Sequence, residues 1–121
     1  MWRKIGSPGF PFDEALIRAR SALLYDRSNH PAGQARQLAA ILAHGNRAPR
    51  LAGVRAPTLV MHATEDAMVS LEEARRLAAG IPGARFVALQ SQNHLLLDDE
   101  PAFARLLWEI RNFVANPRLQ P

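Results

Sequence analysis

The chain has 121 residues, which is enough for one small domain. Its composition, 48% hydrophobic and 21% charged, is typical of a folded globular protein and argues against a disordered chain. Because there is no cysteine, a disulfide framework and thiolate metal sites are excluded. No apolar run approaches the roughly 18 residues of a membrane span, and the first residues lack the pattern of a signal peptide. We therefore expect a cytoplasmic protein without a membrane partner.

Positive charge exceeds negative charge, since 15 lysines and arginines stand against 11 acidic residues and give a net charge of +4. All but Lys4 of the basic residues are arginines. A phosphate or nucleic-acid surface is one interpretation. However, the arginines are spread from Arg3 to Arg118 and form no dense block interleaved with exposed aromatic residues, which nucleic-acid binders use. We favour arginines on solvated helix faces and predict no nucleic-acid partner.

The N-terminal part of the chain, residues 1–50, is predicted to be helical. Residues 1–12 are rich in Gly, Pro and Phe and indicate an irregular lead-in. Asp13 suits the N-cap of a first helix. Pro31 suits the first turn of a second helix, which Gly45 would end. The residues that the second helix is expected to bury are Leu38, Ile41 and Leu42.

The pattern changes to alternating strands and helices in residues 51–121. The short apolar segment 58–62 predicts a buried strand, and residues 84–89 predict a second strand. Between them, Ser70 and Glu73 have the spacing of a capping box at the start of a helix. Strand, helix and strand in this order predict parallel pairing through a right-handed crossover.

A final helix is expected after the second strand. The acidic residues 98–100 favour a helix start, Pro101 suits the first turn, and Asn116 with the following proline ends the pattern. An apolar stripe along this helix indicates that it packs on the core. The stripe comprises Phe103, Leu106, Leu107, Ile110, Phe113 and Val114. The complete order of elements predicts an α/β fold class.

Two residues of catalytic type follow the two predicted strands. Asp66 lies four residues beyond the first strand, and His94 lies five residues beyond the second. Because ligands bind at the carboxyl ends of parallel strands, both residues fall on the edge of the sheet where catalytic groups belong. A carboxylate beside an imidazole fixes the imidazole tautomer and stabilises the imidazolium. His94 could then act first as a general base and later as a general acid.

These segments are similar to the C-terminal end of α/β-hydrolases. Residues 56–69 are similar to the acid-bearing segment of many members, and residues 81–86 and 93–97 are similar to the final strand and the histidine loop. In that family the triad residues follow the order nucleophile, acid, histidine. The resemblance therefore implies that Asp66 is the triad acid and that His94 is the base.

The resemblance extends to other parts of the chain. Segments within residues 25–42 resemble the end of the helical cap in esterases and methylesterases of the superfamily. Residues 93–97 with 100–102 also resemble hydrolase-like modules fused to some signalling cyclases and transcription regulators. The fold implied is the C-terminal part of an α/β-hydrolase, with two parallel strands and flanking helices, preceded by cap-like helices. One departure is Ala63, where the family usually has Gly.

The chain lacks the pattern of a serine nucleophile. A nucleophile elbow is a Gly-x-Ser-x-Gly turn between a strand and a helix, and no serine has these neighbours. Gly6 and Gly9 flank a serine, but at the wrong spacing and without a preceding strand. The serines are Ser7, Ser21, Ser28, Ser70 and Ser91. The implied triad therefore has its acid and its base without the serine, and we expect the chain to be inactive alone.

The same residues also have structural interpretations. Asp66 could cap the following helix or satisfy the backbone of its loop, and His94 could be a packed imidazole. His62 at the end of a strand is more typical of packing than of catalysis. His62, Glu65 and Asp66 have metal-ligand side chains, but a turn of this kind usually faces solvent, so we predict no metal and no cofactor. The expected connector and helix-end residues are His30 and His44.

Two functions of different classes fit these observations. The first is a fragment or subunit of a serine hydrolase of the carboxylic-ester type, either truncated or completed by a second chain that supplies the serine. The second is a non-catalytic, self-associating or regulatory module derived from a hydrolase. Two parallel strands make a poor sheet by themselves, which favours a partner. We expect either a homodimer or a complementary chain supplying the N-terminal half.

Overall fold

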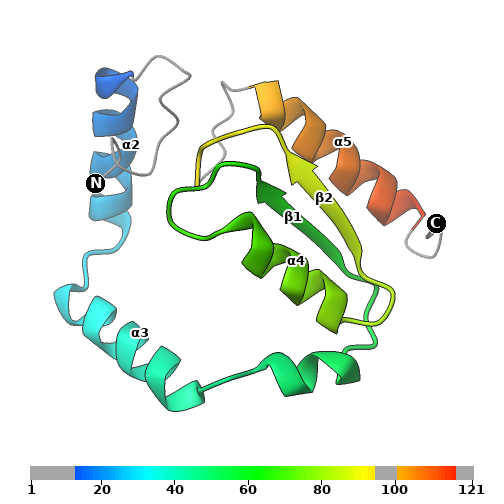
Figure 1. The fold of residues 1–121 in the computed structure, drawn as a ribbon. Helices are drawn as coiled ribbons and strands as arrows, with labels where there is room; N and C mark the ends of the chain where they lie inside the picture. Colours follow the sequence, from blue (N-terminus) through cyan, green and yellow to red (C-terminus); the bar gives the residue numbers. More distant parts are fainter. Residues whose placement is uncertain (1–12, 95–100, 117–121) are drawn as a thin grey trace. The chain divides into compact units, whose positions relative to one another are not determined.

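The computed structural model describes residues 13–94 and 101–116, so the predicted lead-in over 1–12 and the residues 95–100 lie outside the described part. That part is a mixed α/β structure of helices and a two-stranded parallel sheet (Figure 1), which confirms the predicted class at this level. In chain order the elements are α2 (Glu14–Arg27), α3 (Pro31–His44), the 3-10 helix η1 (Ala48–Gly53), β1 (Leu59–Ala63), α4 (Leu71–Gly80), β2 (Arg85–Leu89) and α5 (Pro101–Ala115).

The chain divides into two compact units, of which the first contains α2 and α3 and ends at Arg47. Asp13 is the N-cap of α2, and its Oδ1 accepts a hydrogen bond from the Leu16 backbone N–H at 2.9 Å. Pro31 opens α3, and Gly45 ends it with a φ of 64°, a left-handed value that favours glycine. The sequence therefore predicted both helix starts and the end of α3 correctly.

The predicted burial along α3 is wrong. Leu38, Ile41 and Leu42 are all exposed, and α3 contains no buried residue within the described part of the chain. The spacing of apolar residues determines which face of a helix is apolar, but it does not determine whether a neighbour covers that face. The first unit consists of only two short helices, so it provides little surface to cover either of them.

The second unit begins at Ala48 and is built around the sheet. β1 and β2 pair in parallel, with Leu59 opposite Arg85 and Ala63 opposite Leu89. The helix α4 connects them, as the strand–helix–strand pattern predicts. Its N-cap is Ser70, whose Oγ accepts a hydrogen bond from the backbone N–H of the third helical residue at 3.4 Å. The predicted helix start is therefore confirmed.

The core lies between α4 and one face of the sheet. Val60 of β1 is buried with Ala74 and Ala78 of α4, and the half-buried Phe86 of β2 packs against them. The helix η1, which the sequence did not predict, packs against the C-terminal end of α4. A Cβ atom added to Gly80 would lie 2.7 Å from the Leu51 Cδ1, so glycine permits the close approach of these two helices.

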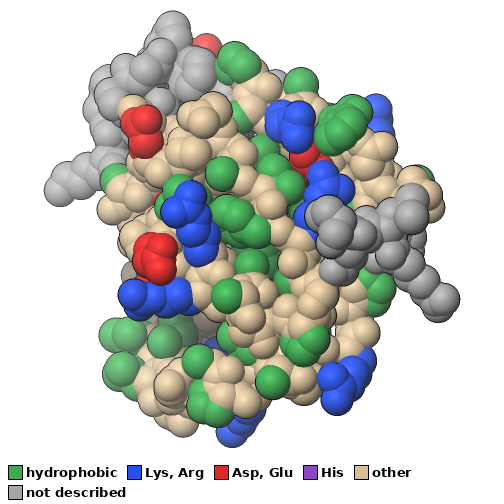
Figure 2. All heavy atoms as spheres, turned by 45° about the vertical axis from the view of Figure 1, so that its right-hand side comes forward, with side chains coloured by type: hydrophobic (Ala, Val, Ile, Leu, Met, Phe, Trp, Pro, Cys, Tyr) green, Lys and Arg blue, Asp and Glu red, His purple; other side chains and the backbone are tan. Residues whose placement is uncertain are grey.

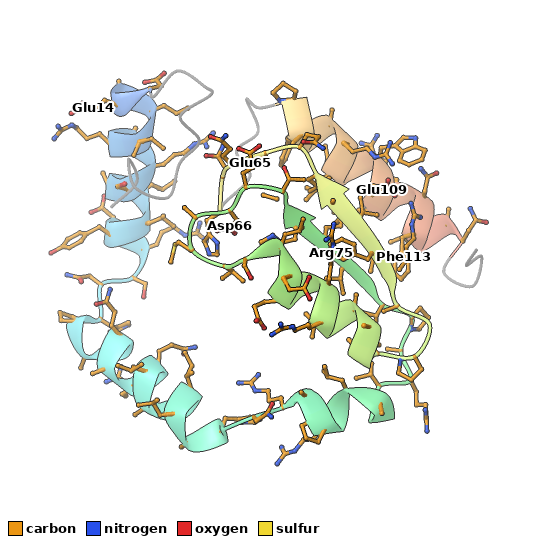
Figure 3. All side chains as sticks on the ribbon, viewed as in Figure 1. Glu14, Glu65, Asp66, Arg75, Glu109 and Phe113 are labelled. Atoms are coloured by element: carbon orange, nitrogen blue, oxygen red, sulfur yellow. The ribbon has the colours of Figure 1, made fainter. Side chains whose placement is uncertain are left out.

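The helix α5 lies on the opposite side of the sheet from α4 (Figure 1). It is held there by Glu109, which is completely buried and forms ion pairs with Arg85 of β2 and with Arg105 of α5 itself. Figure 3 labels Glu109 on α5, away from Asp66 in the loop after β1. Because Arg85 is the first residue of β2, this ion pair lies at the opposite end of the strand from the loop that carries His94.

The apolar stripe of α5 is only partly covered. Phe103, Leu106 and Phe113 are half-buried, but Leu107, Ile110 and Val114 are exposed, the last with 70% of its surface accessible. The prediction that the whole stripe packs in the core is therefore wrong for these three residues. A stripe of this width exceeds what two strands can cover, and hydrophobic side chains reach the surface in Figure 2.

Replacing Glu109 with alanine should strongly destabilise the chain. Its removal leaves Arg85 without its anion and empties a buried position, which costs about 3 kcal/mol of unfolding free energy. Urea denaturation followed by circular dichroism measures this loss. The matched control is Arg76→Ala, because Arg76 pairs with Glu72 and Glu73 at the exposed surface of α4, where an ion pair is worth at most about 1 kcal/mol. Equal losses in the two variants would contradict a buried anchor.

Candidate functional site

The loops that follow β1 and β2 are joined by backbone hydrogen bonds that continue the parallel ladder. The Thr64 N–H donates to the Leu89 carbonyl at 2.9 Å, and the Glu65 N–H donates to the Ser91 carbonyl at 3.0 Å. The two loops therefore run side by side for two residues beyond the strands. This continuation explains why residues 28 positions apart in the sequence meet in space.

Short polar side chains fix the course of the loop after β2. Ser91 and Asn93 are buried, and the Ser91 Oγ accepts a hydrogen bond from the Asn93 backbone N–H at 3.0 Å. The Thr64 hydroxyl donates to the Ser91 carbonyl at 3.4 Å, and the Gln92 amide donates to the Glu65 carboxylate. These roles were not predicted from the sequence. The signal for them is that serine and asparagine side chains bond to nearby backbone.

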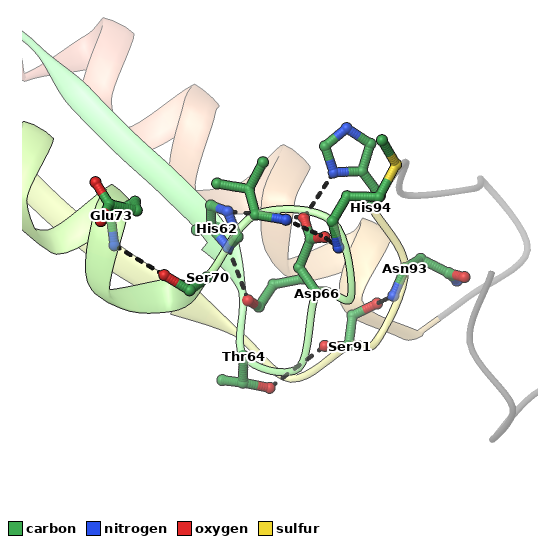
Figure 4. A network of polar contacts seen from close by, with 11 residues as sticks. His62, Thr64, Asp66, Ser70, Glu73, Ser91, Asn93 and His94 are labelled. Carbon is green, nitrogen blue, oxygen red and sulfur yellow. Dashed lines mark hydrogen bonds and ion pairs between the residues drawn. The ribbon is translucent and has the colours of Figure 1, made fainter. Parts of the chain in front are cut away.

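Asp66 and His94 are in direct contact at the end of these loops (Figure 4). The His94 Nδ1 lies 2.7 Å from the Asp66 Oδ2, which is the distance of a charge-assisted hydrogen bond. Only 4% of the Asp66 side chain is exposed, whereas 31% of the His94 side chain is exposed. The structure thus brings together the two residues that the sequence predicted, with the carboxylate inside and the imidazole towards solvent.

The second oxygen of Asp66 holds its own loop. Oδ1 accepts hydrogen bonds from the backbone N–H groups of Met68 at 2.7 Å and Val69 at 3.0 Å. Such an arrangement is the turn that aspartate side chains form with backbone two and three residues on. Oδ1 therefore has the structural role of satisfying the loop backbone, and Oδ2 makes the contact with His94 that a catalytic role needs. The turn fixes the carboxylate, which leaves Oδ2 aimed at the histidine.

The environment favours the ionised form of Asp66. Burial by itself raises the pKa of a carboxyl group, but here the hydrogen bond from His94, the N–H groups of Val69 and Met68, and the charge on His94 outweigh it. The pKa of Asp66 therefore lies below its ordinary value of 3.8. At neutral pH the group is a carboxylate that can only accept hydrogen bonds.

These contacts assign the proton of the neutral His94 ring. Because the ionised Asp66 cannot donate, the His94 Nδ1 must carry the hydrogen between them. In the neutral ring the lone pair is then on Nε2, on a side chain that is partly open to solvent. An imidazole oriented in this way can remove a proton from a neighbouring hydroxyl or water, and the carboxylate stabilises the imidazolium that results.

His62 lies closer to this pair than the sequence suggested. It belongs to β1, and its side chain is mostly buried, with 14% exposed, as expected for a packed strand residue. However, its Nε2 lies 3.7 Å from the Asp66 Oδ2, and its Nδ1 lies 2.8 Å from the Ala63 carbonyl oxygen. In the sequence His62 stands four residues before Asp66, but this spacing indicates a contact only when the turn after β1 is known.

The serines of the described residues have structural positions. Ser70 caps α4, Ser28 follows the last residue of α2, and the Ser91 hydroxyl accepts a hydrogen bond from its own loop. Ser21 lies within α2, and Ser7 is outside the described residues. His30 and His44 lie at the N-cap and the last turn of α3, as the sequence predicted.

In residues 13–94 and 101–116, no group of three or more His, Asp or Glu side chains is arranged to hold a metal ion. The same residues contain no helix that is long and apolar enough to cross a membrane. His62 and His94 both approach the carboxylate of Asp66.

The chain matches no protein-family model, and no characterised protein sequence is significantly similar to it. The resemblance to α/β-hydrolases therefore stays a prediction from the sequence. The contact between Asp66 and His94 is the feature of the structure with a definite chemistry.

The folded chain should lose stability in acid through Asp66. Because the pKa of Asp66 is depressed in the folded state, its contribution is fully present above about pH 4 and is lost as pH falls through the folded pKa. The difference in unfolding free energy between the wild type and Asp66→Asn should therefore be larger at about pH 6 than at about pH 3. Denaturant titrations at both pH values measure it.

The control is Asp26→Asn, because Asp26 is exposed and a substitution at such a surface position should change stability by no more than about 0.5 kcal/mol. A pH-independent difference for Asp66→Asn would mean that the folded state does not favour the carboxylate.

Proposed function

We propose that this chain is the acid- and base-bearing C-terminal part of an α/β-hydrolase of the carboxylic-ester type, acting in the cytoplasm. The observation that carries the proposal is the 2.7 Å contact between the His94 Nδ1 and the buried carboxylate of Asp66. A buried carboxylate that orients a partly exposed imidazole through Nδ1 is the relay half of a catalytic triad.

The position of the pair in the fold supports the same proposal. Asp66 and His94 follow the carboxyl ends of two neighbouring parallel strands, where open α/β sheets place their active sites. The acid precedes the histidine in the chain, as in α/β-hydrolases. In this proposal β1 and β2 are the last two strands of a hydrolase sheet, with α4 and α5 on its two faces. The helices of residues 1–50 are then the end of a cap.

The proposed reaction needs a serine from outside these 121 residues. The His94 Nε2 takes the proton of that hydroxyl while the serine oxygen forms a bond to the carbonyl carbon of the ester. The imidazolium, stabilised by Asp66, then returns the proton to the alkoxide that leaves as the carbon–oxygen bond breaks. Water then forms a bond to the acyl carbon while the His94 Nε2 takes one of its protons. The imidazolium returns this proton to the serine oxygen as the bond between the acyl carbon and that oxygen breaks and the carboxylic acid is released.

The isolated chain should not turn over an activated ester such as a p-nitrophenyl acyl ester faster than its His94→Ala variant. Turnover is expected when the chain is produced together with a polypeptide that carries a Gly-x-Ser-x-Gly elbow, for example one encoded by the adjacent reading frame. In that complex, His94→Ala should lower kcat by about 10⁴-fold or more, and Asp66→Asn should lower it by about 10⁴-fold. The readout is the absorbance of the p-nitrophenolate that is released.

The Ser28→Ala variant serves as a control, because Ser28 only follows the end of α2 and should be dispensable. Robust turnover by the isolated chain, abolished by His94→Ala, would mean that a nucleophile exists within these residues. A complex whose turnover is indifferent to His94→Ala would refute the proposed relay.

A second function, that of a self-associating module, is favoured by the surface of the sheet unit. The described sheet has only two strands, whereas stable sheets usually need three or more or extensive cover. In addition, the stripe of Leu107, Ile110 and Val114 on α5 is exposed and apolar. A symmetric dimer that covers this stripe would remove apolar surface from water in both copies.

Light scattering at micromolar concentration should therefore give a mass larger than that of one chain. Ile110→Glu places a charge within the α5 stripe and should shift the mass towards a monomer, since a charge buried without a partner disfavours association. Ala79→Glu, on the exposed side of α4, is the matched control and should leave the mass unchanged. A strictly monomeric wild type would contradict this function.

A further inference from the structure

The carboxylate of Asp66 is contacted by two imidazoles and not only by His94. Its Oδ2 lies 2.7 Å from the His94 Nδ1 and 3.7 Å from the His62 Nε2 (Figure 4). His62 comes from the strand β1, whereas His94 comes from the loop after β2. A triad relay requires only one of these histidines, so the second calls for its own explanation.

The contacts of His62 determine which of its nitrogens carries hydrogen. Nδ1 lies 2.8 Å from the Ala63 carbonyl oxygen, which can only accept, so Nδ1 must be the donor. In the neutral ring, Nε2 would then direct a lone pair at the Asp66 Oδ2, and the two would repel one another. The approach of Nε2 to the carboxylate is attractive only when Nε2 also carries a hydrogen.

The charged side chains of α4 all lie at its exposed surface. Glu72 and Glu73 pair there with Arg76, and Arg75 is likewise exposed. Asp66 faces His62 directly, and His94 faces it across the shared oxygen. The interaction of His62 is therefore with the carboxylate of the relay.

We propose that His62 is a positioning residue for this relay. When its ring is protonated, His62 is fixed to the Ala63 carbonyl through Nδ1, places an Nε2 donor beside the Asp66 Oδ2 and keeps that oxygen aligned with His94. His62 acts on the oxygen that faces His94, while the backbone of Met68 and Val69 acts on the other. The inference concerns the geometry of the Asp66–His94 pair, so it holds whether or not a serine is supplied.

Two substitutions separate the roles of the two ring nitrogens. His62→Asn keeps an amide donor at the position of Nδ1 and loses the one at Nε2. His62→Gln can place an amide donor near the position of Nε2 and loses the one at Nδ1. If His62 were only a structural residue that ties down the end of β1 at Ala63, the Asn variant would preserve the site. If it positions Asp66, the Gln variant should preserve it instead.

The experiment is proton NMR of the full chain labelled with ¹⁵N in histidine, following the hydrogen on the His94 Nδ1. In the wild type this hydrogen should be observed and protected from exchange with water by its bond to Asp66. In His62→Asn its exchange should accelerate by about tenfold, because the contact that holds the Asp66 Oδ2 in place on the His62 side is lost. In His62→Gln the exchange rate should stay within about twofold of the wild type. Backbone amide spectra establish that both variants are folded.

Three outcomes would contradict a part of this account. An unchanged His94 signal in both variants overturns the proposal for His62 and leaves the Asp66–His94 relay intact. Preservation in His62→Asn together with loss in His62→Gln also overturns it, because His62 would then serve only the backbone. Absence of the protected hydrogen in the wild type would show that the relay itself is not formed, and the proposed hydrolase function would fail with it.

Discussion

The parallel ladder between β1 and β2 continues beyond the strands through two backbone hydrogen bonds, and the site depends on this continuation. The bonds from Thr64 to Leu89 and from Glu65 to Ser91 hold the two loops in register. Without them, Asp66 and His94 would sit on independent loops, and ordering both would cost conformational entropy. With them, the side chains meet at 2.7 Å as a result of strand pairing already stabilised by the core between α4 and the sheet.

The buried carboxylate of Asp66 is the electrostatic centre that this register creates. Burial alone would favour the protonated form, but the hydrogen bonds from His94, Val69 and Met68 together with the charge on His94 lower the pKa of the carboxyl group. Two backbone N–H groups serve Oδ1, and two histidines approach Oδ2. An anion fixed in this way is preorganised to stabilise a charged imidazole next to it, which is the electrostatic property that general base catalysis requires.

Sequence reasoning succeeded where the signal is local. The caps of α2 and α4, the proline at the start of α3 and the short apolar strands were all predicted, because caps and strands depend on neighbouring residues. The meeting of Asp66 and His94 was predictable from topology, since parallel strands end at one edge. The burial of Glu109 was not predictable, because a buried carboxylate depends here on Arg85, which lies 24 residues away in another element. The exposed stripes of α3 and α5 show the same limit, since spacing identifies an apolar face without identifying what covers it.

The central claim is that Asp66 and His94 act as one unit, and a double-mutant cycle on the unfolding free energy tests it most directly. The cycle compares Asp66→Asn, His94→Gln and the double variant with the wild type by denaturant titration at about pH 6. A charge-assisted hydrogen bond to a buried carboxylate predicts a coupling free energy of about 1–2 kcal/mol, with the second substitution costing little once the first is present. Additive effects of the two substitutions would contradict the account, because they would mean that the two side chains do not interact in the folded chain.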